Sequence, residues 1–223
     1  MPTVHYIYDA LCGWCFGFSP VVRQLHDAWK DRIGFDVLSG GMVPPEFARP
    51  IGEKASFIAG AYKTVEEHTG IKFGAAYLEH IFHPGQSSWV EESLTPAIAL
   101  CLLKAAQPYP MADGRGGAVY FAGLIQQAHM IDGQDLSDPE TYRPMAESVG
   151  CDWADFKKKL ESEEWRESAQ YEFALVKQLG ITSFPAVVVQ LSEDKFYLIG
   201  RGFTTYNDLS FRLEQVLKEH APR

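Results

Sequence analysis

The chain has 223 residues, of which 46% are hydrophobic and 22% are charged. This length and composition are ordinary for a globular protein, and they suit one large domain or one domain that carries an insertion. Lys and Arg total 20 against 29 Asp and Glu, which gives a formal net charge of -9. The densest basic cluster, residues 157–159, is interpreted as a solvated helix face, so the composition argues against a protein that binds a phosphate backbone.

The sequence also lacks the patterns of secreted and membrane-spanning proteins. Its start, "MPTVHYIYDAL", contains no Lys or Arg and only a short, alternating apolar stretch, which is not typical of a secretory signal. The longest uncharged apolar run, residues 97–103, is far too short to cross a bilayer. Four cysteines in the whole chain do not resemble a disulfide-stapled scaffold, so we expect a protein of the reducing cytoplasm.

The first 42 residues predict a β-α-β unit. Residues 3–11 are rich in β-branched and aromatic residues and predict a strand that runs into a turn. Residues 13–30 have apolar positions at helical spacing, and Pro20 inside this helix is expected to kink it. Residues 34–42 predict a second strand closed by a glycine pair, with a right-handed crossover between the two strands.

The middle of the chain shows no convincing strand and predicts a block of helices. Pairs of a capping residue and proline mark two helix starts, and glycines stand where helix C-caps are expected. The expected helices are residues 51–69, 93–106, 116–131, 139–149, 152–162 and 163–179. Residues 109–117 are glycine-rich and predict a loop, but they follow no strand and precede no Lys-Ser or Lys-Thr pair, so they do not predict a phosphate-binding loop.

Strands return near the end of the chain. Residues 184–191 and 195–200 predict a β-hairpin, and residues 205–220 predict a closing amphipathic helix. The expected order is therefore β-α-β, a helical block, a helix, two strands and a final helix.

Two cysteines stand at the junction of the first strand and the first helix, in the stretch "CGWC". The free N–H groups and the dipole of a helix N-terminus favour the thiolate form of Cys12, which is the nucleophilic form. Cys15 lies one turn further on, close enough to attack a mixed disulfide formed by Cys12. We therefore predict Cys12 as the exposed attacking thiol and Cys15 as the shielded resolving thiol. On spacing alone, half of a metal site and two inert core thiols remain alternatives.

The chain resembles the DsbA-like branch of the thioredoxin superfamily, including the cytoplasmic FrnE-like disulfide oxidoreductases. The resemblance is carried by "YDALCGWCFGFSP", "VLSGGM", "GCDWADFKKKLES" and "AQYEFALVKQLGITSFPAVVV", and it covers most of the chain. It implies an α/β thioredoxin fold with a helical insertion after the second strand. Residues 1–43 and 168–223 would form the thioredoxin-like domain, and residues 44–167 would form the inserted helical domain.

The resemblance also implies roles for individual residues. Cys12 matches the family's nucleophile, and Cys15 matches its resolving cysteine. Pro20 matches the proline that kinks the active-site helix, and Pro185 matches the cis-proline that faces the dithiol.

Three further residues are expected to contact the substrate. Gly13 and Trp14 separate the cysteines, where the strongly oxidising periplasmic members carry Pro-His instead. Trp14 is expected to be exposed and to offer an apolar contact. Phe184 precedes the proline, at a position where smaller residues are commoner in the family.

We therefore expect a thiol-disulfide oxidoreductase that works through a mixed disulfide, as a reductant or isomerase in the cytoplasm. Its substrate would be a protein or small molecule with a thiol or disulfide, and glutathione or a thioredoxin-like donor is a candidate partner. We expect no cofactor, no metal, no nucleic acid and no membrane. One alternative is a glutathione-dependent isomerase or transferase of the 2-hydroxychromene-2-carboxylate isomerase type, whose members carry serine where Cys12 stands. The other is a non-enzymatic module that binds a metal or cluster.

Several other residues have a functional and a structural interpretation. For Cys101 and Cys151 we favour structural roles, with Cys101 in the core. Asp9 either opposes a Cys12 thiolate through its charge or caps the turn. His5 and His26 are candidates for tuning the dithiol, although satisfied structural histidines are commoner.

Two further groups complete the set of candidates. Glu79, His80 and His83 present possible metal ligands on one helical turn, but a metal site is the weaker interpretation there because no further ligands accompany them. Phe16 and Phe18 are expected to divide between the core and a domain interface.

Overall fold

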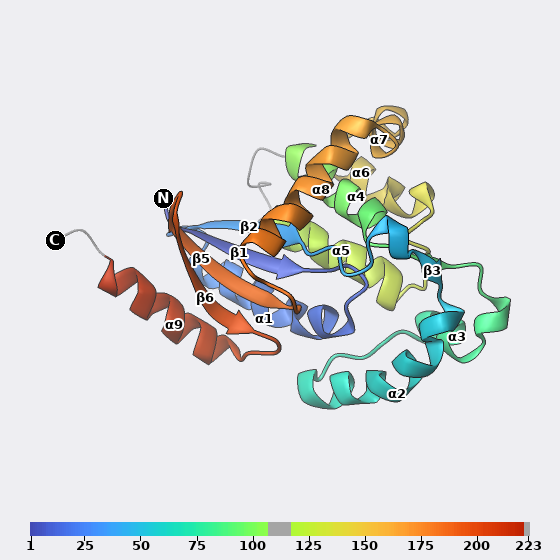
Figure 1. The fold of residues 1–223 in the computed structure, drawn as a ribbon, viewed down its shortest axis with the longest axis horizontal. Coiled ribbons are helices and arrows are strands. Elements are labelled where there is room, and N and C mark those ends of the chain that lie inside the picture. The colour runs from blue at the N-terminus through green and yellow to red at the C-terminus, as the bar shows by residue number, and fades with distance from the viewer. Residues whose placement is uncertain (107–116, 221–223) are drawn as a thin grey trace.

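The computed structural model describes residues 1–106 and 117–220 and holds a four-stranded sheet with the strand order β2-β1-β5-β6 (Figure 1). The strands are β1 (Thr3–Tyr8), β2 (Gly34–Ser39), β5 (Ala186–Ser192) and β6 (Lys195–Arg201). β1 pairs with β2 in parallel and with β5 in antiparallel fashion, and β5 pairs with β6 in antiparallel fashion. The two ends of the chain therefore build one sheet, as the sequence predicts.

Alternate side chains of β1 face opposite sides of the sheet, because successive residues of a strand point to opposite faces. Val4, Tyr6 and Tyr8 enter the large core. That core also holds side chains of α1 (Gly13–Trp29), which joins β1 to β2, and of α9 (Tyr206–Glu219), which follows β6.

The other face of the sheet is covered by α8 (Glu163–Gln178). Ile7 of β1 and Leu38 of β2 meet Val176 of this helix in a smaller core. The sheet is thus buried on both sides, and the turn after β1 lies between the two helical layers. These observations confirm the α/β thioredoxin fold.

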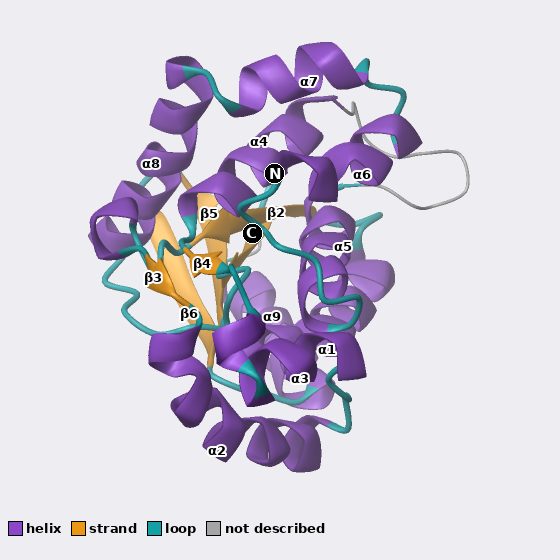
Figure 2. Ribbon diagram, turned by 90° about the vertical axis from the view of Figure 1, so that its right-hand side faces the viewer, coloured by secondary structure: helices purple, strands orange, loops and turns teal. Residues whose placement is uncertain are grey.

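The chain between β2 and α8 is mostly helical, and Figure 2 shows α7 and α2 at opposite ends of the molecule with the sheet between them. Its elements are the short 3-10 turns Pro45–Phe47, Pro84–Gln86 and Pro139–Tyr142, the strands β3 (Arg49–Pro50) and β4 (Val90–Glu91), and the helices α2 (Gly52–Thr69), α3 (Ala75–Phe82), α4 (Leu94–Ala106), α5 (Ala118–Met130), α6 (Arg143–Ser148) and α7 (Trp153–Leu160). No helix in the described part of the chain is long and apolar enough to cross a membrane.

The structure corrects three details of this middle region. The expectation of no strand there is wrong, since β3 and β4 pair in antiparallel fashion, with Arg49 opposite Glu91. Helix α3 was not predicted. The helix expected over residues 139–149 is divided into a 3-10 turn and α6. The loop predicted over residues 109–117 lies outside the described residues except for its last glycine.

A separate core forms beside α1 from residues of the middle region. Phe16 of α1 packs there with Val65 of α2 and with the aromatic rings of Phe73 and Tyr77. Phe18, two residues further along, belongs to the large core under the sheet. Phe16 and Phe18, which both follow the second cysteine of "CGWC", therefore anchor α1 in the two cores. The exact division into residues 44–167 and the remainder stays a prediction, and its second boundary falls inside the continuous helix α8.

One partly buried ion-pair network joins the helical block to the sheet. Lys104 of α4 donates to Asp36 Oδ1 at 3.2 Å, to the Val37 carbonyl at 2.8 Å and to Glu172 Oε1 at 2.5 Å. Glu172 Oε2 in turn accepts from the Ser39 backbone N–H at 2.8 Å. Desolvation lowers the pKa of Lys104, but the charges of Glu172 and Asp36 and the hydrogen bond to Glu172 together outweigh it, and the pKa lies above its usual range.

We expect the Lys104→Met variant to lose about 3 kcal/mol of unfolding free energy, because two carboxylates and one carbonyl lose their buried cation. The matched control is Lys158→Met, which removes an exposed lysine of α7 and is expected to change stability by about 0.5 kcal/mol or less. Urea unfolding at neutral pH measures both. Equal losses in the two variants would contradict a structural role for the network.

Candidate active site

Cys12 occupies the N-cap of α1, directly after the turn that ends β1. Its backbone is extended, and its Sγ accepts a hydrogen bond from the Cys15 backbone N–H at 3.3 Å. A side-chain acceptor at this place satisfies one of the free N–H groups of the first helical turn. The same bond and the helix dipole stabilise negative charge on the sulfur. Both cysteines are free thiols.

The two thiols differ in exposure, but less than expected. Cys12 is only 7% exposed, which corrects the expectation of an exposed thiol, and Cys15 is fully buried. Burial raises the pKa of the Cys15 thiol well above its usual range, and its hydrogen bond with Cys12 adds to this effect. Cys15 is therefore held as a neutral thiol next to a sulfur that lies at the helix N-terminus.

The loop before β5 reaches the Cys12 sulfur. The Phe184–Pro185 peptide bond is cis, and Cys12 Sγ donates to the Phe184 carbonyl across 3.7 Å. The Phe184 ring lies where a side chain at Gly40 would be, with an ideal Cβ there only 2.2 Å from the ring. Gly41, with φ of +66°, similarly makes room for another aromatic ring. The glycine pair that ends the predicted second strand is thus needed for this close approach.

The turn between β1 and α1 is held by the side chain and the backbone of Asp9. Its carboxylate accepts from the backbone N–H groups of Leu11 at 3.0 Å and Met42 at 2.7 Å, and from the Ser93 hydroxyl at 3.1 Å. Its carbonyl accepts from the Cys12 backbone N–H at 3.1 Å and from Gln126 at 3.2 Å. Burial raises the pKa of Asp9, although these hydrogen bonds oppose the shift. Of the two interpretations, the structure supports the turn-capping role.

The first turns of α1 compensate locally for its proline. Pro20 has no N–H to donate to the Phe16 carbonyl, and the Ser19 hydroxyl donates to that carbonyl instead, at 2.8 Å. One turn earlier, the buried Tyr6 hydroxyl donates to the Cys15 carbonyl at 3.2 Å. The helix segment that carries Cys15 is therefore fixed to β1.

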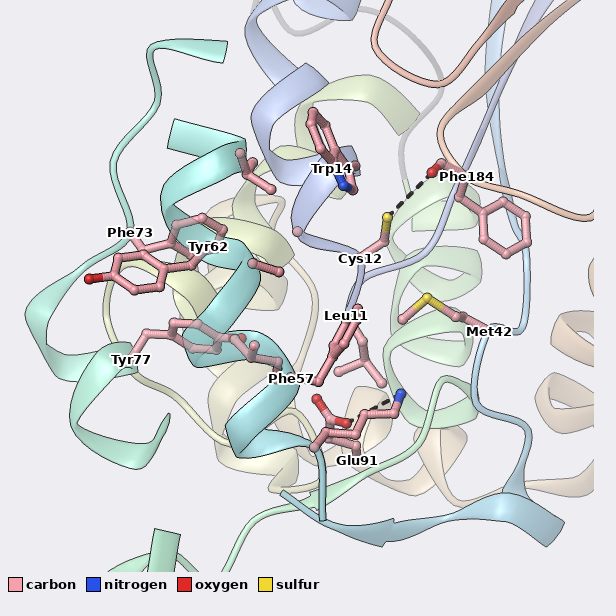
Figure 3. Close-up of a pocket in the computed structure, with 15 residues that line it drawn as sticks. Leu11, Cys12, Trp14, Met42, Phe57, Tyr62, Phe73, Tyr77, Glu91 and Phe184 are labelled. Carbon is pink, nitrogen blue, oxygen red and sulfur yellow. Dashed lines mark hydrogen bonds and ion pairs between the residues drawn. The ribbon is translucent and has the colours of Figure 1, made fainter. Parts of the chain in front are cut away.

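Cys12 opens into a pocket of about 270 Å³ between α1, α2, α3 and β4 (Figure 3). Cys12, Gly13, Trp14 and Phe184 line it, whereas Cys15 and Pro185 do not. The opposite wall is built from the middle region and is rich in aromatic side chains: Phe57, Tyr62, Phe73 and Tyr77. Trp14 is half-buried rather than exposed, with its ring edge-on to His68 at 5.8 Å between centroids.

Two charged side chains interrupt this apolar lining. Lys54 of α2 and Glu91 of β4 both face the pocket, with Lys54 Nζ 3.6 Å from Glu91 Oε2. Glu91 is 4% exposed, and in Figure 3 it lies at the far end of the pocket from Trp14, with Cys12 and Leu11 between them. Burial raises the pKa of Glu91, against the opposing effect of Lys54.

The other candidate residues lie outside this pocket. Cys101 is buried and donates to Glu172 across 3.5 Å, and burial raises its pKa. Cys151 is half-buried, and burial raises its pKa too. His5 bonds to Gln190 at 2.8 Å on the sheet.

The remaining histidines also have structural partners. His26 packs its ring against Phe35, and His80 stacks on Trp89 at 3.7 Å. His83 lies 3.6 Å from Glu79. Within the described residues, no group of three or more His, Cys, Asp or Glu side chains is placed to hold a metal ion.

Sequence reasoning missed the second wall of the pocket. Lys54, Glu91 and the aromatic residues around them lie on helices, on the loop between α2 and α3, and on a two-residue strand, and no short motif marks these segments. The one available signal is that two aromatic residues, Phe73 and Tyr77, closely follow the helix-ending Gly70. Their positions in the sequence do not show that the two rings lie in the same pocket as Cys12.

Comparison with known proteins agrees with the fold. A family model described as the DSBA-like thioredoxin domain matches residues 3–202. Among solved structures, a Nitrosomonas europaea protein assigned as a protein disulfide isomerase shares 22% identity, with a TM-score of 0.80 and 99% of each chain covered. The cytosolic disulfide reductase DsbM from Pseudomonas aeruginosa shares 22% identity, with a TM-score of 0.75 over 97% of this chain and 99% of the other. A 2-hydroxychromene-2-carboxylate isomerase is more distant, at 13% identity and a TM-score of 0.59 over 97% and 95% of the two chains. Comparison with curated protein sequences gave no match.

We expect Cys12 to react with iodoacetamide at neutral pH at least about ten times faster than the other three cysteines, whose pKa values are raised by burial. Peptide mass spectrometry after short exposure measures the rate at each site. Cys12→Ser is expected to remove the fast phase, whereas Cys151→Ser, the matched control at a half-buried thiol, keeps it. A fast phase that survives Cys12→Ser would contradict the assignment.

Proposed function

Since the chain belongs to the DSBA-like thioredoxin-domain family, we propose that it is a thiol-disulfide oxidoreductase that uses Cys12 and Cys15. The observation that carries the proposal is the placement of Cys12. Its sulfur caps a helix N-terminus and lies beside the Phe184 carbonyl, and Cys12 lines a largely apolar pocket. Cys15 lies one helical turn further on as a buried thiol.

The reaction runs in two exchanges. The Cys12 thiolate attacks one sulfur of a substrate disulfide, which forms a mixed disulfide and releases the first substrate thiol. Cys15 then loses its proton and attacks Cys12 Sγ, which closes the Cys12–Cys15 disulfide and releases the second thiol. The substrate gains two electrons and two protons, and the protein dithiol is oxidised by two electrons. A thiol donor must restore the dithiol for the next turnover.

The partners follow from this chemistry. The substrate is a protein or small molecule that contains a disulfide or thiol, and glutathione or a thioredoxin-like protein is the candidate donor. A structure of DsbM with GSH is among the similar structures, which supports a small thiol as partner. We place the activity in the cytoplasm, where thiols are kept reduced. The description of DsbM as cytosolic supports this location.

We expect Cys12→Ser to lower the rate of insulin-disulfide reduction by at least about a hundred-fold, because it removes the attacking sulfur. Cys15→Ser is expected to stop turnover at the first exchange and to accumulate a mixed disulfide on Cys12, visible as added mass that dithiothreitol removes. Cys151→Ser serves as the control and is expected to keep the wild-type rate.

The Cys15→Ser variant also separates the alternatives. A glutathione-dependent isomerase of the 2-hydroxychromene-2-carboxylate type needs no resolving thiol, so its activity would survive this change. A metal- or cluster-binding module would lose bound metal in both cysteine variants and would show no disulfide reduction in the wild type.

The surroundings of Cys12 favour a reducing dithiol. Gly13 and Trp14 place no cation beside the sulfur, and the chain has a net charge of -9. Within the described residues, the sulfur accepts a hydrogen bond from the Cys15 backbone N–H and donates to the Phe184 carbonyl. A reduced form that is stabilised only by a helix N-terminus gives a weaker oxidant than one that is also stabilised by a neighbouring imidazolium.

We expect a reduction potential nearer ~−270 mV, as in thioredoxin, than ~−120 mV, as in DsbA. Replacement of Gly13-Trp14 by Pro-His is expected to raise the potential, and proline is compatible with the first helical position that Gly13 occupies. Equilibration with a glutathione series, read by alkylation and mass shift, measures both proteins. A wild-type potential above about −150 mV would contradict a reducing role.

A further inference from the structure

The pocket that holds the Cys12 sulfur also holds a buried ion pair that the two exchanges do not use. Lys54 Nζ and Glu91 Oε2 are 3.6 Å apart, which is beyond hydrogen-bond distance, and their side chains are 24% and 4% exposed. Removing two charges from water is costly, and their attraction repays this cost only when the remaining donors and acceptors are satisfied.

Neither group is satisfied by its neighbours. Among residues 1–106 and 117–220, the polar contact of Lys54 Nζ is Glu91 Oε2 at 3.6 Å, although an ammonium group has three donors. Glu91 Oε2 likewise accepts no hydrogen bond from the described residues. Both side chains line the cavity beside Cys12, so the donors of Lys54 and the carboxylate of Glu91 face a molecule that enters it.

The rest of the lining is apolar and aromatic, and the cavity volume of about 270 Å³ lies near the lower end of small-molecule sites. A ligand complementary to this lining carries one negative and one positive group at one end and a sulfur at the other. A carboxylate would accept from Lys54, and an ammonium group would donate to Glu91. An amino-acid head group has both groups on one carbon.

Resting on the function proposed above, we propose that Lys54 and Glu91 select small disulfides that carry a zwitterionic amino-acid head group. The carboxylate of the head group binds Lys54, its ammonium group binds Glu91, and its disulfide is presented to Cys12. Cystine-like disulfides are the substrate class that this arrangement fits.

The electron balance is that of the two exchanges above. The Cys12 thiolate breaks the substrate S–S bond and forms a mixed disulfide while one amino-acid thiol leaves. Cys15 then releases the second thiol, and the two thiol protons of the protein end on the two products. A single turnover of pre-reduced protein therefore needs no further reductant.

Four small disulfides test the proposal on the full chain. Cystine carries both charges, cystamine only the ammonium groups, dithiodipropionate only the carboxylates, and hydroxyethyl disulfide neither. Second-order rates of single-turnover oxidation are measured by acid quench and mass spectrometry of the protein thiols. Each rate is divided by the rate at which dithiothreitol reduces the same disulfide, so that differences between the leaving thiols cancel.

We expect the normalised rate for cystine to exceed each of the other three by at least about ten-fold, as for loss of one hydrogen bond to a charged group. In Lys54→Met the ratio of cystine to hydroxyethyl disulfide is expected to fall by about the same factor. The matched control is Lys63→Met, which removes an exposed lysine of the same helix that does not line the pocket, and it is expected to keep the ratio.

Two results overturn the selection while leaving the oxidoreductase function intact: equal normalised rates for all four disulfides, or the same fall in ratio for Lys63→Met as for Lys54→Met. Failure to reduce any of the four would overturn the proposed function and the selection with it. Circular dichroism checks the fold of each variant. If Lys54→Met does not fold, the neutral double variant Lys54→Met/Glu91→Gln replaces it, with the same expected fall in the ratio of cystine to hydroxyethyl disulfide. The comparison of the four disulfides on the wild-type protein needs no variant.

Discussion

The buried carboxylate of Asp9 is the interaction on which the geometry of the site depends. It receives N–H groups from Leu11 and Met42 and the hydroxyl of Ser93, so it joins the turn after β1, the loop after β2 and the start of α4. These three segments are far apart in the sequence, and Leu11 and Met42 also line the pocket beside Cys12. A buried carboxylate is costly unless its oxygens are hydrogen-bonded, and here the donors that satisfy it are also the groups that must be held in place.

The site is built from two halves that fold for different reasons. The half that carries the dithiol follows from the β-α-β unit, because the end of β1 and the N-terminus of α1 meet wherever such a unit forms. The opposite half depends on the core that joins Phe16 to Val65, Phe73 and Tyr77. Since Phe16 directly follows Cys15, packing in that core also fixes the position of the dithiol. The Phe16 side chain of α1 therefore links the wall of the pocket to the position of the dithiol.

The sequence predicts the first half of the site better than the second. The spacing of Cys12 and Cys15 and the strand-helix junction are local features, and α2, α4 and α8 each have an end close to a proline or a glycine. Helix α3 follows Gly74 and is only eight residues long, which is too short for its hydrophobic periodicity to be recognised in the sequence. The strand containing Glu91 has two residues, and only its pairing with Arg49 makes it a strand. Burial likewise depends on tertiary packing, which is why Cys12 is less exposed than its place in a turn suggests.

The dithiol and the pocket wall opposite it lie on different elements, so the wall can vary while the dithiol is kept. Cys15 is enclosed by β1 and α1, with its carbonyl bonded to Tyr6, and nothing in its surroundings depends on the substrate. The walls that meet a substrate come from α2, α3 and β4, whose side chains can change without disturbing the sheet. Charge placed on that wall acts on a bound molecule and not on the resolving thiol. In the proposed mechanism, the Lys54–Glu91 pair on this wall selects the disulfide that reaches Cys12, and the exchange itself is carried out by Cys12 at the helix N-terminus and by the buried Cys15.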